Sequence, residues 1–211
     1  MKISMAVKSL LGAAALALPL MASAESNVQS NASPLTVTAR VNFSIVVAKT
    51  LYLRVGPGSS YTTGVLAANS NTPDPITFTP SITVLGNGTA VTGTGGDLTN
   101  GVETAAIVSN GGTVSLVANA TGALSNGTAT IPYTQITTTA SAGTFPTLLN
   151  APTLANGASN TITLTPVPAT GVVLADAKWS YAYANTAVVA PGTYGATAAN
   201  NGIVTYTATM P

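Results

Sequence analysis

Apolar and polar residues alternate with a period of two along most of this chain, and no segment beyond residue 24 has the period of an amphipathic helix. The clearest alternating run covers residues 35–47. One of its faces carries Leu35, Val37, Ala39, Val41, Phe43, Ile45 and Val47, and the other carries Thr36, Thr38, Arg40, Asn42, Ser44 and Val46. This run predicts a long β-strand with one apolar face.

Further alternating runs predict strands along the rest of the chain, at 51–55, 76–85, 104–109, 113–118, 129–138, 161–165, 178–184 and 202–209. Turn-forming residues separate them, including Asn87-Gly88, Asn126-Gly127 and Asn201-Gly202, which supply the positive φ angles of tight hairpins. Residues 89–100 show no apolar face and predict an exposed loop. Many short strands without helical crossovers indicate an all-β fold, an antiparallel β-sandwich formed by a single domain at 35–211.

The first 24 residues have the features of a secretory signal peptide. Lys2 and Lys8 form a positive region, an apolar stretch follows, and Ala22-Ser23-Ala24 is a small-residue cleavage site. A polar segment, 25–34, comes next. We expect an exported protein, and no later apolar stretch is long enough to predict a transmembrane helix.

The charge content limits the chemistry that the chain can perform. It has six Lys and Arg, five Asp and Glu, and neither histidine nor cysteine. Catalysis would lack an imidazole or a thiolate, and a metal site would lack soft ligands. The net charge of +1 becomes −1 when Lys2 and Lys8 are removed, which predicts no nucleic-acid binding. We therefore expect a structural or binding protein that is not an enzyme and that has no metal or cofactor.

Three sets of residues are candidates for a site: the acidic residues, a charged pair, and three aromatic residues. Asp74, Asp97, Glu103 and Asp176 are isolated along the sequence and predict no catalytic pair. Asp176 and Lys178 share one face of a strand, which is typical of a surface strand start, with a lysine base as the alternative. Aromatic residues alternate along the same strand and predict a core face, with a ligand-stacking platform as the alternative: Trp179, Tyr181 and Tyr183.

The apolar face of residues 35–47 requires a partner. Burying five of its side chains at roughly 1.5–3 kcal/mol each would contribute on the order of 8–15 kcal/mol before opposing terms. That partner could lie within one subunit, in which case this is an ordinary first strand, or in a second subunit. At the other end, residues 202–209 alternate and predict a last strand that closes the sheet.

Both ends resemble a known family. The segment TVTARVNFSIVVAKTLYL is similar to the donor strand and first strand of archaic chaperone–usher pilus subunits, relatives of the secreted spore coat U domain, and PGTY with VTYTATMP is similar to their closing strands. The chain departs from the family in lacking a disulfide, in a hairpin that interrupts the C-terminal segment, and in ending on Met210-Pro211.

The resemblance implies an immunoglobulin-like sandwich that lacks one strand and receives the N-terminal strand of the next subunit. It implies that Leu35, Val37, Ala39, Val41 and Phe43 fill the partner's groove. It also implies a homopolymer, a periplasmic chaperone, an outer-membrane usher and a location in a cell-surface or extracellular filament. The leading hypothesis is thus a non-catalytic pilus or fimbria subunit. The alternative is a self-contained secreted sandwich that binds carbohydrate or another surface as an adhesin.

Overall fold

The computed structural model describes residues 26–31, 33–58, 60–62, 66 and 72–211. The chain divides after Val47 into two units, and the compact one is Ala48–Pro211. The candidate donor strand, residues 35–47, which the expected domain 35–211 includes, thus falls in the first unit. The expected signal peptide, residues 1–24, lies outside the described residues.

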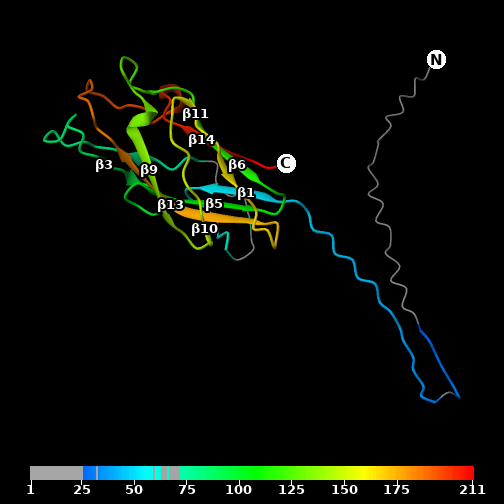
Figure 1. Ribbon diagram of the computed structural model, residues 1–211. Coiled ribbons are helices and arrows are strands. Elements are labelled where there is room, and N and C mark those ends of the chain that lie inside the picture. The colour runs from blue at the N-terminus through cyan, green and yellow to red at the C-terminus, as the bar shows by residue number, and fades with distance from the viewer. Residues whose placement is uncertain (1–25, 32, 59, 63–65, 67–71) are drawn as a thin grey trace, which may run out of the picture. The chain divides into compact units, whose positions relative to one another are not determined.

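The compact unit is all-β, and its larger sheet has six strands (Figure 1). The path β1–β5–β13 forms its centre, and β9, β10 and β3 pair with β13. These strands are β1 (Leu51–Val55), β3 (Val91–Thr92), β5 (Val102–Ser109), β9 (Ile136–Ala142), β10 (Thr147–Leu148) and β13 (Val173–Tyr183). The pairs are antiparallel except β10 with β13, which is parallel and departs from the expected all-antiparallel arrangement.

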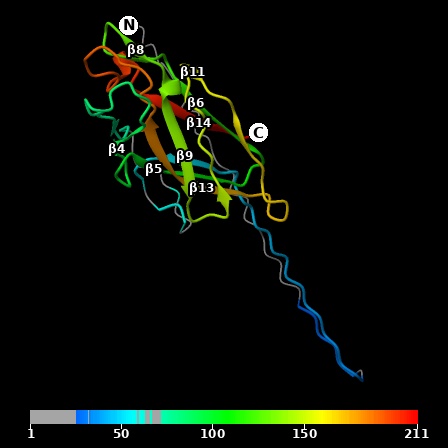
Figure 2. The same ribbon diagram turned by 60° about the vertical axis from the view of Figure 1, so that its left-hand side comes forward.

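The second sheet has four strands arranged around β6. On one side β6 pairs with β11 and β12, and on the other with β14, which lies beside it in Figure 2. The strands are β6 (Val114–Ala120), β11 (Gly157–Ala158), β12 (Ile162–Leu164) and β14 (Val204–Thr209). Two short pairs and two single turns of 3-10 helix complete the unit: β2 (Ile76–Thr77) with β4 (Thr94–Gly95), β7 (Leu124–Ser125) with β8 (Thr130–Ile131), η1 (Tyr133–Gln135) and η2 (Ala198–Asn200).

The core lies between the two sheets and follows the period-two alternation of the strands. Inward-facing side chains of β5, β6 and β13 are almost completely buried, and Trp179 is 0% exposed. The indole Nε1–H of Trp179 donates to the carbonyl oxygen of Leu149 at 2.7 Å, so its one polar atom is satisfied. The all-β sandwich predicted from the sequence is confirmed.

Several predicted strands form with different limits. The runs at 51–55, 104–109, 113–118, 161–165, 178–184 and 202–209 coincide with β1, β5, β6, β12, β13 and β14, although β13 begins five residues earlier. The run at 129–138 is divided between β8, η1 and β9. The loop expected at 89–100 contains β3 and β4.

The strand expected at 76–85 is wrong beyond Thr77, and Asn185 explains the conformation that replaces it. This residue follows β13, is 0% exposed, and has a φ of 52°. Its Oδ1 accepts from Gly86 N at 2.8 Å, and its Nδ2 donates to Val84 O at 2.7 Å. The buried side-chain amide of Asn185 therefore forms hydrogen bonds with backbone groups of a turn at residues 84–86. In this turn-containing segment Ile82 is 91% exposed, so it does not have the inward position of a strand residue.

Asp176 is not at a surface strand start, as the sequence suggested. It lies inside β13 and is 0% exposed, because residues 143–145 and Tyr61 cover it. Its carboxylate accepts hydrogen bonds from Thr144 N at 2.6 Å, Phe145 N at 2.8 Å and Tyr61 Oη at 2.7 Å. Three donors compensate for the lost hydration of this charge. Lys178 is exposed and does not share this environment.

We predict that Asp176→Asn lowers the free energy of unfolding by about 2–4 kcal/mol, because an amide places a donor where backbone N–H groups also donate. Gly143→Ala should act similarly, since its Cβ would overlap the Asp176 carboxylate. Urea unfolding measures both, and Lys178→Gln on the same strand is the control. Equal stabilities of Asp176→Asn and Lys178→Gln would contradict the role given to this carboxylate.

Candidate functional site

The two long flanks of the sandwich differ in how they are closed. Along one flank, residues 149–154 cross from the end of β10 in the first sheet toward β11 in the second. Leu149 is 0% exposed, Leu154 is 8% exposed, and Pro152 is among the fully buried residues. This segment closes the first flank with apolar side chains.

The other flank is bordered by β1 and β14. Among the described residues, β1 pairs only with β5 and β14 only with β6, so each strand has one backbone edge without a ladder. Their apolar side chains contact the core but are only partly buried: Leu51, Leu53, Val55, Val204, Tyr206, Ala208 and the following Met210. We call these two edges and seven side chains the open flank.

The residues along the open flank can be ordered from contacts between the sheets. Leu51 is opposite Ser109, whose Oγ lies 3.1 Å from the Sδ of Met210. Farther along β14, the ring of Tyr206 lies 5.3 Å from that of Trp179, and its hydroxyl is 3.0 Å from that of Tyr181. Tyr206, the largest side chain that β14 contributes to the open flank, is thus held in place by two aromatic residues of β13.

One end of the open flank holds both the root of the N-terminal segment and the C-terminus (Figure 1). Lys49 Nζ donates to Pro211 O at 3.0 Å. Asn110 accepts from Thr50 N at 2.7 Å through Oδ1 and donates to Ala48 O at 2.8 Å through Nδ2. The start of β1 and the end of β14 thus lie at the same end of the sandwich.

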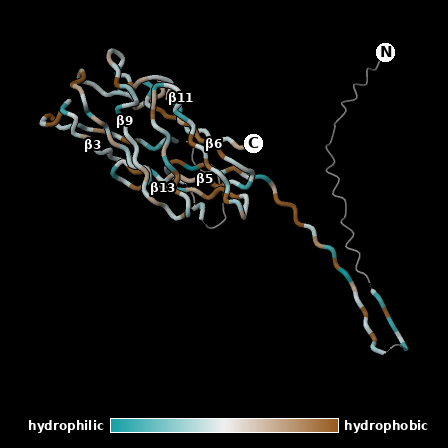
Figure 3. The backbone as a smooth tube through the Cα atoms, viewed as in Figure 1, coloured by the Kyte–Doolittle hydropathy of each residue, from teal (hydrophilic) through white to brown (hydrophobic). Residues whose placement is uncertain are grey.

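Residues 35–47, which we call the arm, form no strand in the structure and belong to the first unit. Apolar positions recur along this segment in Figure 3, and their side chains are exposed. Leu35 is 56% exposed, Val41 63% and Phe43 85%. Every residue of the arm is exposed and none lies in a strand, so the long β-strand predicted for residues 35–47 does not form in the described structure.

The three alternating aromatic residues do not form a ligand platform. Trp179, Tyr181 and Tyr183 are 0%, 7% and 6% exposed, because they occupy the inward positions of β13. Trp179 and Tyr181 contact Tyr206 of the second sheet, and Tyr183 packs against Phe78. Their ring faces therefore leave little room for a carbohydrate ring to stack. The core-face interpretation of these residues is confirmed.

A cluster of charged residues that the sequence does not reveal lies where β1 ends. Arg54 donates to Asp97 Oδ2 at 2.9 Å, and Asp97 Oδ1 accepts from Thr104 N at 2.7 Å. Glu103 is next to this pair, 4% exposed, and accepts from Asp97 N at 3.4 Å. Burial, together with the carboxylates of Asp74 and Asp97, raises the pKa of Glu103 to about 8.

Sequence reasoning missed Glu103, although its position carried a signal. Glu103 is in phase with Ala105 and Ile107, which are both 0% exposed and face the core. A carboxyl group at a strand position that faces the core is expected to have a raised pKa unless a cation lies beside it. The proximity of Asp97, in contrast, depends on a turn that brings residues 97 and 104 together.

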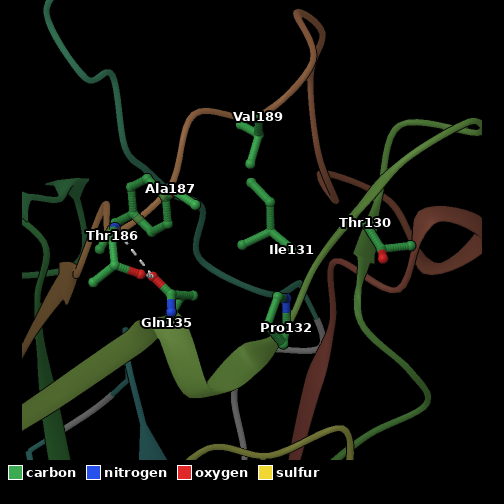
Figure 4. Close-up of a pocket in the computed structure, with 8 residues that line it drawn as sticks. Thr130, Ile131, Pro132, Gln135, Thr186, Ala187 and Val189 are labelled. Atoms are coloured by element: carbon green, nitrogen blue, oxygen red, sulfur yellow. Dashed lines mark hydrogen bonds between the residues drawn. The ribbon is translucent and has the colours of Figure 1, made fainter. Parts of the chain in front are cut away.

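A shallow hollow of about 230 Å³ lies elsewhere, between η1 and the segment after β13 (Figure 4). Its walls are mainly apolar, and the hydroxyl of Thr186 donates to Gln135 Oε1 at 2.8 Å beside it. No charged side chain lines the hollow. It offers little to orient a ligand, so the open flank is the stronger candidate site.

Comparisons with protein-family models, with curated proteins and with solved structures find no match for this chain. Within the described ranges, no helix has the length and apolar character needed to cross a membrane. The same residues contain no group of three or more acidic side chains placed to bind a metal ion.

We predict that stability falls as pH rises toward and through 8. The native state retains the Glu103 proton up to about pH 8, whereas the unfolded chain releases it near 4.5, so the native state binds more protons between these values. The slope should approach about 1.4 kcal/mol per pH unit for this one group.

Urea unfolding of the wild type and of Glu103→Gln between pH 5 and 9 measures this effect. Glu103→Gln should flatten the profile, because the amide does not titrate. Parallel profiles for the two proteins would show that Glu103 is ionised like an ordinary surface carboxylate.

Proposed function

We propose that this protein is a non-catalytic structural subunit of a secreted surface filament, similar to a pilus or fimbria, that polymerises by donor-strand complementation. The arm of one copy fills the open flank of the next. One observation carries the proposal: among the described residues β1 and β14 each pair along one edge only, and the same chain has an exposed alternating segment long enough to pair with such an edge.

The chemistry of the two parts is complementary. The unpaired edge of β14 offers backbone N–H and C=O groups, which an incoming strand can pair. The apolar face of the arm would cover the seven partly buried side chains of the open flank, while its polar face remains in water. Thirteen arm residues span about 43 Å as a strand, and the seven residues from Val204 to Met210 span about 23 Å.

The position of the arm root favours an open filament. Ala48 leaves the sandwich at the end where β14 stops. An incoming arm antiparallel to β14 connects to its own sandwich at the opposite end, so subunits follow one another head to tail. A parallel arm would bring both connections to one end and favour a closed pair. Antiparallel pairing is also slightly more stable per residue.

Export and assembly partners belong to the same proposal. The subunit passes through the periplasm, and its unpaired edge needs a temporary cover there, because exposed edges pair nonspecifically. A periplasmic chaperone supplies this cover and an outer-membrane usher orders the assembly, as the family resemblance implies. The adhesin alternative has lost its proposed platform, since Trp179 and its neighbours are buried.

We predict that deleting residues 35–43 leaves export and folding of the sandwich intact but prevents assembly. The deletion removes the strand that fills the partner's flank and none of the residues of Ala48–Pro211. Size-exclusion chromatography and electron microscopy of the purified mature chain measure assembly, and its circular dichroism measures folding. Filaments formed by the deleted protein, or only monomers formed by the intact protein, would refute the proposal.

We also predict that Val41→Asp abolishes assembly, whereas Asn42→Asp has little effect. A carboxylate on the apolar face would be buried without a partner at a cost of several kcal/mol, but one on the polar face stays hydrated. Both residues lie outside the compact unit, so the thermal stability of the unassembled protein should not change. Equal losses of assembly in the two variants would mean that the arm does not bind through this face.

A further inference from the structure

We propose that the arm pairs antiparallel with β14 in a register that places Ala39 opposite Tyr206, and that Ala39 sets this register. This inference rests on the proposed function and specifies how one copy recognises the next. It also places Leu35 opposite Met210, Val37 opposite Ala208, and Val41 opposite Val204.

The argument begins with the alternating sizes of the β14 side chains. The inward residues of β14 are Val204, Tyr206 and Ala208, and Met210 follows them in the same phase; the large Tyr206 and the small Ala208 are neighbours on this face. The inward residues of β1, Leu51, Leu53 and Val55, vary much less in size. The shape of the open flank is therefore determined mainly by Tyr206 and Ala208.

The apolar face of the arm varies in a complementary way, with its smallest residue, Ala39, between two valines. Close packing favours large residues facing small ones, so that neighbouring layers interdigitate. Ala39 fits against Tyr206, whose ring is already fixed by Trp179 at 5.3 Å. Val37 then fills the space beside the small side chain of Ala208.

The two nearest registers that keep the same face inward fit less well. In the first, Ala39 is opposite Ala208, which leaves a void at that level and moves Leu35 beyond Met210. In the second, Val37 is opposite Tyr206, which crowds the aromatic ring. A void and an overpacked contact both destabilise a core. A shift by one residue would turn Arg40 inward.

Disulfide trapping tests the register directly, because the chain contains no cysteine. In the proposed register Thr38 lies opposite Thr207; Thr207 is an exposed residue of β14, and Thr38 is on the polar face of the arm. A full-length chain carrying Thr38→Cys, mixed with one carrying Thr207→Cys, should form a heterodimeric disulfide on oxidation. The matched controls replace Thr38→Cys with Thr36→Cys or Arg40→Cys, which lie one step away in either direction and should cross-link at least fivefold more slowly.

The outcomes separate the register from the proposed function. Faster cross-linking of Thr36→Cys or Arg40→Cys, with assembly intact, would overturn the register but retain strand exchange. Equal rates for all three pairs, with assembly intact, would also overturn a single register. No intermolecular disulfide at any pair, together with a monomeric wild type, would overturn the proposed function and the register with it.

Two arm variants give a second measurement that does not depend on disulfide chemistry. Ala39→Val should weaken assembly roughly tenfold by crowding Tyr206, whereas Val37→Ile should change it less than threefold, because it enters the space beside Ala208. A stronger assembly of Ala39→Val would indicate that Ala39 faces Ala208, and a greater loss with Val37→Ile would indicate that Val37 faces Tyr206. Either result would overturn the proposed register.

Discussion

The unequal closure of the two flanks is the constraint on which the rest of this structure depends. A two-layer sandwich must cover the sides of its core as well as its faces, and here residues 149–154 cover one side with Leu149, Pro152 and Leu154. No described residue of the compact unit pairs with the outer edges of β1 and β14. Their inward side chains are consequently only partly buried, although the same alternation gives complete burial in β5 and β13. The domain is thus a core whose apolar side chains are only partly covered along one side.

Two buried carboxyl groups, those of Asp176 and Glu103, have very different hydrogen-bond environments in this fold. Asp176 is enclosed by three hydrogen-bond donors and connects β13 to the chain around Tyr61 and Thr144. Glu103 faces the core, accepts one long hydrogen bond, and has another carboxylate beside it, so its neutral form is favoured up to about pH 8. The first carboxylate contributes to stability through these three hydrogen bonds. The second lowers stability as pH rises toward 8, because the native state holds a proton that the unfolded chain has already released, and it lies where β1 ends, close to the open flank.

The alternation of side chains predicts most of the sandwich because strand burial is a local property of the sequence. It places Trp179 and Tyr181 in the core and identifies β1, β5, β6, β12, β13 and β14. It fails where distant segments decide the outcome. The buried amide of Asn185 converts an alternating run near Val84 into a turn, and residues 143–145 bury an Asp176 that the strand phase alone directs outward. The candidate site was predictable in one half only: the arm is visible in the sequence, whereas the open flank depends on which strands become edges.

The root of the arm offers a physical reason why the covering strand should come from a second copy. To fill its own flank, the arm would have to reverse direction immediately before β1. Asn110 holds Ala48 and Thr50 through two hydrogen bonds, and a tight turn at these residues would break both. The reversal would then fall on residues 44–47, which include Ile45, Val46 and Val47. β-Branched residues are poorly suited to the positive φ angles of tight hairpins, so intramolecular insertion is opposed by local conformation. An arm that continues in extended form keeps its apolar face available to another subunit.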